Sequence, residues 1–484
     1  MEGCEDSGAR RVAIVATSVA AALVLRLVFF QGVWGSDDLH HLRYALEWDR
    51  LPANQWEARL LFNGSLWLSI RAFGTGEMAY ALPSLMGSLL AVGSTAWCAM
   101  HFGGRRAGLF SGLIAASLPI DVLHATVPVA MPCAAGLAAF GTAVWATARS
   151  RFAFAATCAA FALAGLVHWA VWFYVAALCA GSFCSASSAW ERWRAIRVGL
   201  GSCAVFVVLE LGLFWAIAGD PLYELHVIGS QHVTPTLANQ DPRTWIWLLE
   251  PLGLALFSKD FGPLLAIAAV AGFVARRRLH EALRGFSLAI PFLWFWIGYG
   301  TQWPTVYLPL KLMRFAHPAI LPLSVLVGVL LARTNRGGSW ATAAIAATSV
   351  ALVASSGSWG QHVEITKAFL PYVQSHPQTR FLADRQSLLE VFVLSGGDGL
   401  DNLSWWDDPP PADGAALALL DNSLSRESWD ARWLAGETLF TTDPEYRLIG
   451  RLLPEAWGRY SEWFVRRPEA RIVRVDQRAD APPR

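Results

Sequence analysis

Residues 12–48, VAIVATSVAAALVLRLVFFQGVWGSDDLHHLRYALEW, join an apolar run to a pair of acids and a pair of histidines. The apolar run, 12–33, is long enough to cross a bilayer as a helix, because about 20 apolar residues span the hydrocarbon core. No small-residue cleavage site follows it, so we expect an uncleaved first span with Arg10 and Arg11 on its cytoplasmic side. The acids and histidines then lie just outside the membrane.

Similar apolar runs recur through the first 358 residues. The chain of 484 residues is 55% hydrophobic and only 15% charged, whereas soluble proteins carry about a quarter charged residues. Its 38 Lys and Arg balance 37 Asp and Glu, so no basic field indicates a nucleic-acid partner. We predict about eleven spans, at 12–33, 79–100, 107–122, 128–148, 152–168, 169–184, 198–218, 261–275, 287–300, 315–333 and 339–356.

Basic clusters fall at alternate ends of these spans, as the positive-inside rule requires. They predict a cytoplasmic amino terminus and an outer location for segments 34–78, 219–260 and 301–314 and for the tail. The Ala, Arg and Trp content favours a bacterial inner membrane. The clusters are Arg10-Arg11, Arg105-Arg106, Arg149-Arg151, Arg192-Arg194-Arg197, Arg276-Arg277-Arg278 and Arg333-Arg336.

The tail has a different composition and contains none of the seven cysteines. Residues 379–397, TRFLADRQSLLEVFVLSGG, predict a strand, a helix and a glycine turn, and 414–422 predict a buried strand. The proline-rich 407–414 predict a loop and 478–484 a disordered end. We therefore predict a polytopic α-helical membrane domain, 1–358, with a first outer loop, 34–78, and a soluble extracytoplasmic α/β domain, 359–484, on the periplasmic or extracellular side.

Asp37 and Asp38 are adjacent carboxylates at the mouth of a membrane span, and two interpretations fit them. A carboxylate near the lipid interface can deprotonate an acceptor hydroxyl while its neighbour orients the acceptor or binds a cation. Alternatively, Ser36, Asp37 and Asp38 form an acidic start for a helix over 39–48. The pair alone does not decide between them.

The chain resembles the GT-C glycosyltransferases, in particular the branch with the protein O-mannosyltransferases and the lipid A aminoarabinose transferase. In that family a short acidic motif followed by a helix with an aromatic residue supplies the catalytic base, and Asp37-Asp38 with Tyr44 fits it. The similarity continues through 57–92, EARLLFNGSLWLSIRAFGTGEMAYALPSLMGSLLAV, and 102–119, FGGRRAGLFSGLIAASLP. It covers about residues 10–150 well and the rest in outline.

Two departures from the family pattern affect the site. Ala81 stands where the family has an arginine before its LPS sequence, and 125–136, ATVPVAMPCAAG, lacks the acid expected early in the fourth span. Asp121 and His124, on the preceding outer turn, are the nearest substitutes. Either this turn has taken over the role of the second acid, or activity is altered or lost.

The resemblance implies inverting transfer of a sugar from a polyprenyl phosphate to a lipid, glycan or protein at the outer face of the bilayer, with Asp37 as base. The departing phosphate needs cations, and Lys311 and Arg314 in 307–322, YLPLKLMRFAHPAILP, suit that role, although both could instead snorkel to headgroups. Candidate contacts to donor or acceptor are His41, Tyr44, Asp121, His124 and His317.

Three further side chains have less specific interpretations. His40 and His41 could bind a divalent metal with the acid pair, but successive residues of a helix do not face one another, so we assign no certain cofactor. Arg26, inside the first span, is a weaker candidate for the phosphate site than Lys311 and Arg314, because an arginine near a helix end can also snorkel to the interface.

Two other functions remain compatible with the sequence. A transporter or flippase of a lipid-linked sugar would use the same polar residues, although no internal repeat is evident. A catalytically degenerate relative would explain Ala81 and the missing acid.

Overall fold

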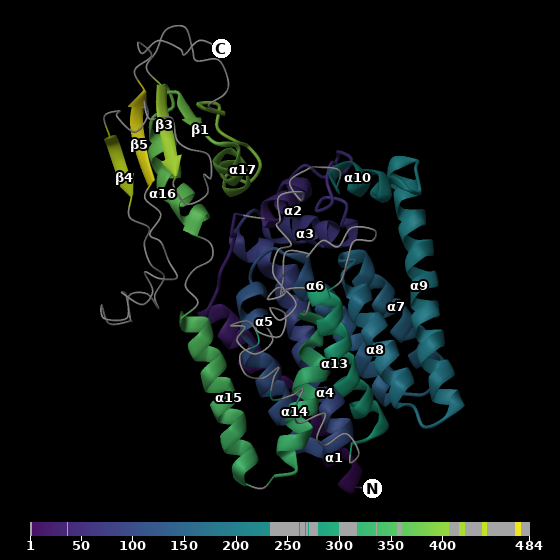
Figure 1. Ribbon diagram of the computed structural model, residues 1–484. Helices are drawn as coiled ribbons and strands as arrows, with labels where there is room; N and C mark the ends of the chain where they lie inside the picture. Colours follow the sequence, from purple (N-terminus) through teal and green to yellow (C-terminus); the bar gives the residue numbers. More distant parts are fainter. Residues whose placement is uncertain are drawn as a thin grey trace, which may run out of the picture. The chain divides into compact units, whose positions relative to one another are not determined.

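The computed structural model describes residues 2–35, 37–232, 261, 267, 270, 279–299, 317–334, 336–355, 361–405, 416–421, 438–442 and 470–475. The chain divides into two compact units (Figure 1), which we describe separately. The helical unit comprises Met1–Phe30, Leu51–Ser65 and Ala81–Val353, and the tail unit comprises Gln31–Arg50, Leu66–Tyr80 and Ala354–Arg484. Helices α3 (Leu60–Phe73) and α4 (Glu77–Ser117) contribute residues to both units.

Long apolar helices build the helical unit. Within the described residues, five are long and apolar enough to cross a membrane, 8–28, 77–117, 130–147, 189–218 and 336–354, and three shorter apolar helices accompany them. The helices are α1 (Glu2–Val28), α5 (Pro119–His124), α6 (Ala130–Thr147), α7 (Arg151–Val167), α8 (Val171–Ser185), α9 (Ala189–Ala218), α10 (Tyr223–His232), α13 (Glu281–Tyr299), α14 (Ile320–Ala332) and α15 (Arg336–Ser355).

The predicted apolar runs coincide with these helices wherever the structure describes them. Runs 79–100 and 107–122 belong to α4, which bends sharply at Gly104, and to the short α5 that follows. Most of run 261–275 lies outside the described residues. The prediction of a polytopic helical membrane protein is confirmed, while the span count of eleven stays a prediction.

The outward surface of α9 shows why this unit needs lipid. Leu200, Val208 and Trp215 expose 67%, 70% and 69% of their surface, and such side chains along a whole helix would form an apolar patch too large for a soluble monomer. A bilayer removes that cost. The chain is therefore an integral membrane protein.

Small residues let the inner helices approach closely. A Cβ atom on Gly136 of α6 would come within 2.1 Å of the Gly87 carbonyl oxygen on α4, so the two backbones touch, as is common where helices associate in membranes. Helices α6, α7, α8 and α13 also lie side by side (Figure 1), and a hydrogen bond of 2.8 Å joins Thr142 on α6 to Tyr174 on α8. These contacts make a dense helical core.

In the described residues, the tail unit combines a five-stranded mixed sheet with three whole helices and the parts of α3 and α4 named above. The sheet has the order β2-β1-β3-β5-β4, in which β1 pairs in parallel with β2 and β3, and β5 pairs antiparallel with β3 and β4. The elements are α2 (Asp37–Leu46), α16 (Gln361–Ser375), β1 (Phe381–Ala383), α17 (Arg385–Leu394), β2 (Leu403–Trp405), β3 (Ala416–Asp421), β4 (Thr438–Thr442) and β5 (Ala470–Val475).

Local sequence explains how this sheet begins. Asp384 ends β1 and caps α17, accepting hydrogen bonds from the backbone N–H groups of Gln386 and Ser387. Phe381, Phe369 of α16 and Ile472 of β5 pack together in the core. The strand, helix and glycine turn predicted for 379–397 and the strand predicted in 414–422 are confirmed. The predicted loop and disordered end lie outside the described residues, and the division at residue 358 stays a prediction.

Candidate functional site

The acid pair opens helix α2 in the tail unit. Asp38 is fully buried, and its Oδ2 accepts hydrogen bonds from the backbone N–H groups of Trp34 (2.6 Å) and Gly35 (3.3 Å). Asp37, the first residue of α2, is half-buried. Acidic residues in a first turn stabilise the helix through its dipole, so the helix-start interpretation holds for the pair. The Asp38 carboxylate is thus bound to the backbone of the turn.

Residues of the tail also contact the turn that carries Asp37 and Asp38. The Gln386 side chain on α17 donates a hydrogen bond of 2.6 Å to the Gly35 carbonyl oxygen. The buried carboxylate of Glu390, one turn further along α17, lies against Gly35 and accepts hydrogen bonds from Gln386 and from Thr366 on α16. Hydrogen bonds and packing from the tail thus hold the turn that carries Asp37 and Asp38.

Glu77 makes a second connection between the outer loop and the tail. Its Oε1 accepts hydrogen bonds from the Val33 backbone N–H (3.1 Å) and from the Lys367 ammonium on α16 (2.8 Å). The Tyr80 hydroxyl donates to the Val393 carbonyl oxygen at 3.1 Å. The geometry of the acidic turn therefore depends on residues more than 300 positions away in the sequence.

Gly35 supplies a sharp test of this packing. Its φ is +83°, and a Cβ there would lie 2.5 Å from Glu390 Oε1. Gly74 has the same φ, with no atom near its Cβ position. We expect Gly74→Ala to cost about 1–2 kcal/mol from left-handed strain, and Gly35→Ala to cost about 1–3 kcal/mol more from overpacking. Thermal unfolding of both variants measures the difference, and equal melting temperatures would contradict the packing.

The other candidates on α2 are packed residues. His41 and Tyr44 are buried, and the Tyr44 ring lies 5.4 Å from Trp48 and 5.3 Å from the Arg50 guanidinium. Tyr44 therefore forms a cluster with the Trp48 ring and the Arg50 guanidinium. In the part of the chain that the structure describes, no group of three or more His, Cys, Asp or Glu side chains is arranged to hold a metal ion. His40 and His41 therefore belong to no such group.

The helical unit contains a buried ionic cluster that begins at Arg26. Its guanidinium is fully buried and ion-paired with Asp121 on α5, and it donates to Ser88 Oγ (2.6 Å) and to the carbonyl oxygens of Ala22 (2.9 Å) and Ala116 (2.8 Å). These partners satisfy the charge of Arg26 inside the helix packing, so its side chain does not snorkel to the interface.

The same cluster brings together three of the predicted contact residues. The Asp121 Oδ1 atom lies 2.7 Å from His317 Nε2, and the His124 ring is 6.0 Å from that of His317. His124 Nδ1 is 2.8 Å from the Ile120 carbonyl oxygen. His317 is fully buried, and its Nδ1 has no hydrogen-bond partner among the described residues. The cluster thus ends in an imidazole nitrogen that can take a ligand.

Three side chains surround the Asp121 carboxylate. Arg26 is ion-paired with Oδ2, Ser88 Oγ donates to Oδ2 at 2.7 Å, and His317 Nε2 lies 2.7 Å from Oδ1. These contacts fix the orientation of the His317 ring.

A second acidic pair in the helical unit was missed by the sequence reasoning. Burial and the neighbouring Glu210 of α9 raise the pKa of Glu224 on α10 to about 9, although Arg59 acts in the opposite direction. The sequence did contain a signal for this pair, because an ionisable residue such as Glu210 in an apolar helix indicates a functional site.

The raised pKa of Glu224 predicts a pH dependence. The folded protein retains a proton that the unfolded chain releases above its usual glutamate pKa, so stability should fall as the pH rises from about 5 to 9. Glu224→Gln should reduce the difference in melting temperature between pH 5 and pH 9, whereas Asp398→Asn, at an exposed position of the tail unit, should not. An unchanged pH profile in Glu224→Gln would show that the pair does not share a proton.

Lys311 and Arg314, the predicted phosphate contacts, lie outside the described residues. They precede His317 in the sequence by a few positions.

Comparison with known proteins gives similarity at the level of structure. No family model matches the sequence, and no curated protein sequence does. The fold is similar to ArnT from Cupriavidus metallidurans in the apo state, with a TM-score of 0.61, 15% identity and coverage of 98% of this chain and 99% of that chain. It is similarly close to the same protein bound to undecaprenyl phosphate, with a TM-score of 0.60, 16% identity and coverage of 97% and 99%.

A more distant similarity is to the oligosaccharyltransferase of Archaeoglobus fulgidus in the apo form, with a TM-score of 0.49, 10% identity and coverage of 80% of this chain and 64% of that chain. ArnT is a lipid A aminoarabinose transferase of the GT-C superfamily. The similarity to ArnT extends over nearly the whole of both chains, and this chain has the same fold.

Proposed function

We propose that this protein transfers a sugar from a polyprenyl-phosphate donor to a hydroxyl group of a lipid, glycan or protein at the outer face of a bacterial inner membrane. The observation that carries the proposal is the full-length similarity in fold to ArnT, one structure of which holds undecaprenyl phosphate. The acid pair directly after the first span, and an ionic cluster that ends in a histidine, support the same chemistry.

Asp37 is the proposed base. It removes the proton from the acceptor hydroxyl as that oxygen attacks the anomeric carbon of the donor sugar. The bond between this carbon and the phosphate oxygen breaks, its electron pair leaves with the polyprenyl phosphate, and the anomeric configuration inverts. Asp38, through its bonds to the Trp34 and Gly35 N–H groups, positions Asp37 at the start of α2.

The leaving phosphate requires positive charge near the membrane surface. Lys311 and Arg314 are the proposed contacts, because charged donors stabilise a phosphate oxyanion strongly. His317 follows them in the sequence, and its Nδ1 is proposed to form a hydrogen bond with a hydroxyl of the donor sugar. Asp121 and Arg26 orient His317 without touching the substrate, which gives this turn a role even though the fourth span lacks the acid of the family pattern.

Purified protein in lipid nanodiscs tests the proposal. Incubation with a set of polyprenyl-phosphate sugars and an extract of membrane lipids and glycans should release free polyprenyl phosphate and give a product with inverted anomeric configuration, which NMR coupling constants report. Movement of intact donor across a sealed bilayer without release of polyprenyl phosphate would support a flippase instead.

A further inference from the structure

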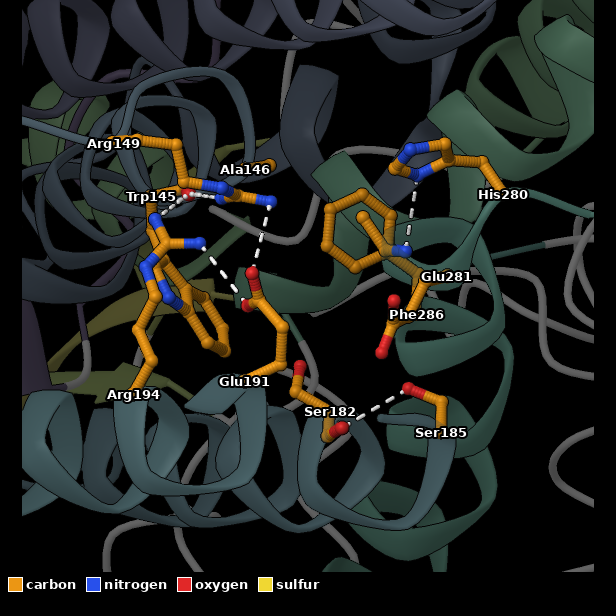
Figure 2. Close-up of a pocket in the computed structure, with 11 residues that line it drawn as sticks. Trp145, Ala146, Arg149, Ser182, Ser185, Glu191, Arg194, His280, Glu281 and Phe286 are labelled. Carbon is orange, nitrogen blue, oxygen red and sulfur yellow. Dashed lines mark hydrogen bonds and ion pairs between the residues drawn. The ribbon is translucent and has the colours of Figure 1, made fainter. Parts of the chain in front are cut away.

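Arginines gather where helices α7 and α9 begin. Residues 149–197 contain five arginines and a single acid, Glu191. The Glu191 carboxylate lies 3.7 Å from Arg149 and 3.5 Å from Arg194, and Figure 2 shows these three side chains beside a small pocket of the helical unit. Arg149 and Arg194 also donate to the Trp145 carbonyl oxygen, at 3.2 Å and 2.6 Å. Two of the five arginines are therefore bonded within the protein and balance the one acid of the segment.

The other three arginines have no such partner. Arg151, the first residue of α7, and Arg192 and Arg197 of α9 are exposed, and none of them forms an ion pair or a hydrogen bond with the described residues. The Arg151 guanidinium lies 5.6 Å from the centre of the Phe152 ring, and that of Arg197 lies 4.5 Å from the Trp190 ring. A guanidinium stacked on a ring keeps the N–H donors at its edge available. Arg151 and Arg197 therefore present accessible donors in a defined orientation.

Arg197 belongs to the outward side of α9. Trp190, Trp193, Arg197 and Leu200 follow one another at intervals of three or four residues, so they share one side of the helix. Trp190 and Trp193 expose 63% and 61% of their surface, and Leu200 begins the exposed apolar surface that continues to Trp215. Tryptophan and arginine gather at the headgroup layer of a membrane. Arg197 therefore lies where the lipid-facing side of α9 reaches the headgroups.

Arg151 lies at the same level on the neighbouring helix. Helices α7 and α9 pack side by side, and the ion pair of Glu191 described above joins their starts. A Cβ atom on Gly201 of α9 would lie 3.3 Å from the Phe154 ring of α7, so the two helices touch at this point. Arg151 precedes Phe154 by three residues and Arg197 precedes Gly201 by four, which is about one helical turn in each case. The two guanidinium groups thus extend from adjacent helices at about the same depth.

The charges around these two arginines favour an anionic headgroup. A phosphate oxygen forms strong hydrogen bonds with guanidinium groups. A headgroup that also carries an ammonium needs a carboxylate, but Glu191 is already ion-paired. Glu281 of α13, on the other side of the pocket in Figure 2, accepts from the Ser187 N–H (2.5 Å) and Oγ (3.1 Å). An anionic lipid satisfies the exposed cations without a further acid.

We propose that Arg151 and Arg197 bind the phosphate of an anionic glycerophospholipid, whose acyl chains lie along the outward side of α9. Phe152 and Trp190 hold the two guanidinium groups in place, and Trp193 contacts the headgroup region beside them. The positive-inside rule places this end of the helices in the cytoplasm, so the lipid belongs to the inner leaflet. The site is independent of the proposed transfer reaction, because none of its residues belongs to the acidic turn or to the Arg26 cluster.

Native mass spectrometry of the detergent-purified chain, titrated with single phospholipids, tests the proposal. A basic side chain near an anionic lipid headgroup strengthens binding about fivefold, so phosphatidylglycerol should bind about 20-fold more tightly than phosphatidylethanolamine or phosphatidylcholine. Arg151→Gln combined with Arg197→Gln should abolish this preference. Arg105→Gln combined with Arg192→Gln is the matched control, because it removes the same charge from two exposed arginines outside the site. Arg192 lies two residues from Trp190, on a different side of α9, and the control should keep the preference.

Three results would overturn the proposal. The first is equal binding of the three phospholipids by the wild type. The second is a loss of preference that is the same in the control as in the Arg151 and Arg197 variant, which would indicate attraction by the total charge alone. The third is binding of free glycerol phosphate as tightly as the lipid, which would identify a soluble ligand. Melting temperatures show whether each variant is folded, and if the double variant is unstable, Arg197→Gln alone decides, with an expected loss of about fivefold.

Discussion

Asp37→Asn is expected to slow sugar transfer by about 10²–10⁴-fold while the protein remains folded and retains its donor affinity. The amide cannot take the proton of the acceptor hydroxyl, and general-base catalysis contributes about this factor. The effect should appear in kcat rather than in KM for the donor. Single-turnover transfer with purified protein at matched concentration measures it.

Two control variants separate this role from the packing around it. Asp49→Asn, an exposed acid shortly after α2, should transfer at the wild-type rate. Asp38→Asn should lower the melting temperature, because Asp38 accepts two backbone hydrogen bonds in a fully buried position. Full transfer by Asp37→Asn would place the base elsewhere. Loss of transfer together with loss of folding would indicate a structural role.

Arg26→Met should destabilise the helical unit by about 3–5 kcal/mol, the usual effect of removing one partner of a buried ion pair. The substitution leaves the Asp121 carboxylate buried without its main countercharge and leaves Ser88 and two carbonyl oxygens without their donor. Thermal unfolding in a single detergent measures the loss. Arg11→Met, at an exposed position of the same helix, is the matched control and should melt as the wild type does.

A compensating variant sharpens this test. Combining Arg26→Met with Asp121→Leu removes both charges, and buried ion pairs replaced by apolar residues often cost little. The double variant should therefore be more stable than Arg26→Met alone, while the loss of Asp121 frees the imidazole of His317. A double variant no more stable than Arg26→Met would mean that the charge of Asp121 is not the source of the destabilisation.

The spans and the tail elements could be predicted from sequence because their signals are local. A run such as 12–33 fixes a helix by its length and apolar character, and 379–397 show a strand, a cap at Asp384 and a glycine turn within 19 residues. The acidic start of α2 could also be predicted from the sequence. Its two explanations use the same residues, and the catalytic role of Asp37 stays a prediction.

Contacts between distant residues could not be predicted in the same way. The sequence left Arg26 as a weak phosphate candidate that could also snorkel, because its partner Asp121 lies on another element. Asp121, His124 and His317 were each predicted as contacts to donor or acceptor, but the hydrogen bond between Asp121 and His317 depends on packing between α5 and the residues just before α14. The hydrogen bond from Gln386 to the Gly35 carbonyl oxygen likewise depends on packing between elements that are distant in the sequence.

The most direct measurement of the central claim is transfer of label from a mixture of radiolabelled polyprenyl-phosphate sugars into membranes that contain the wild-type protein or Asp37→Asn at matched expression. The account predicts that label enters an acceptor fraction only with the wild type, and extraction then assigns that acceptor to lipid, glycan or protein. No incorporation with either protein, across the full set of donors, would contradict a glycosyltransferase and leave a degenerate relative or a lipid-sugar transporter with the same fold.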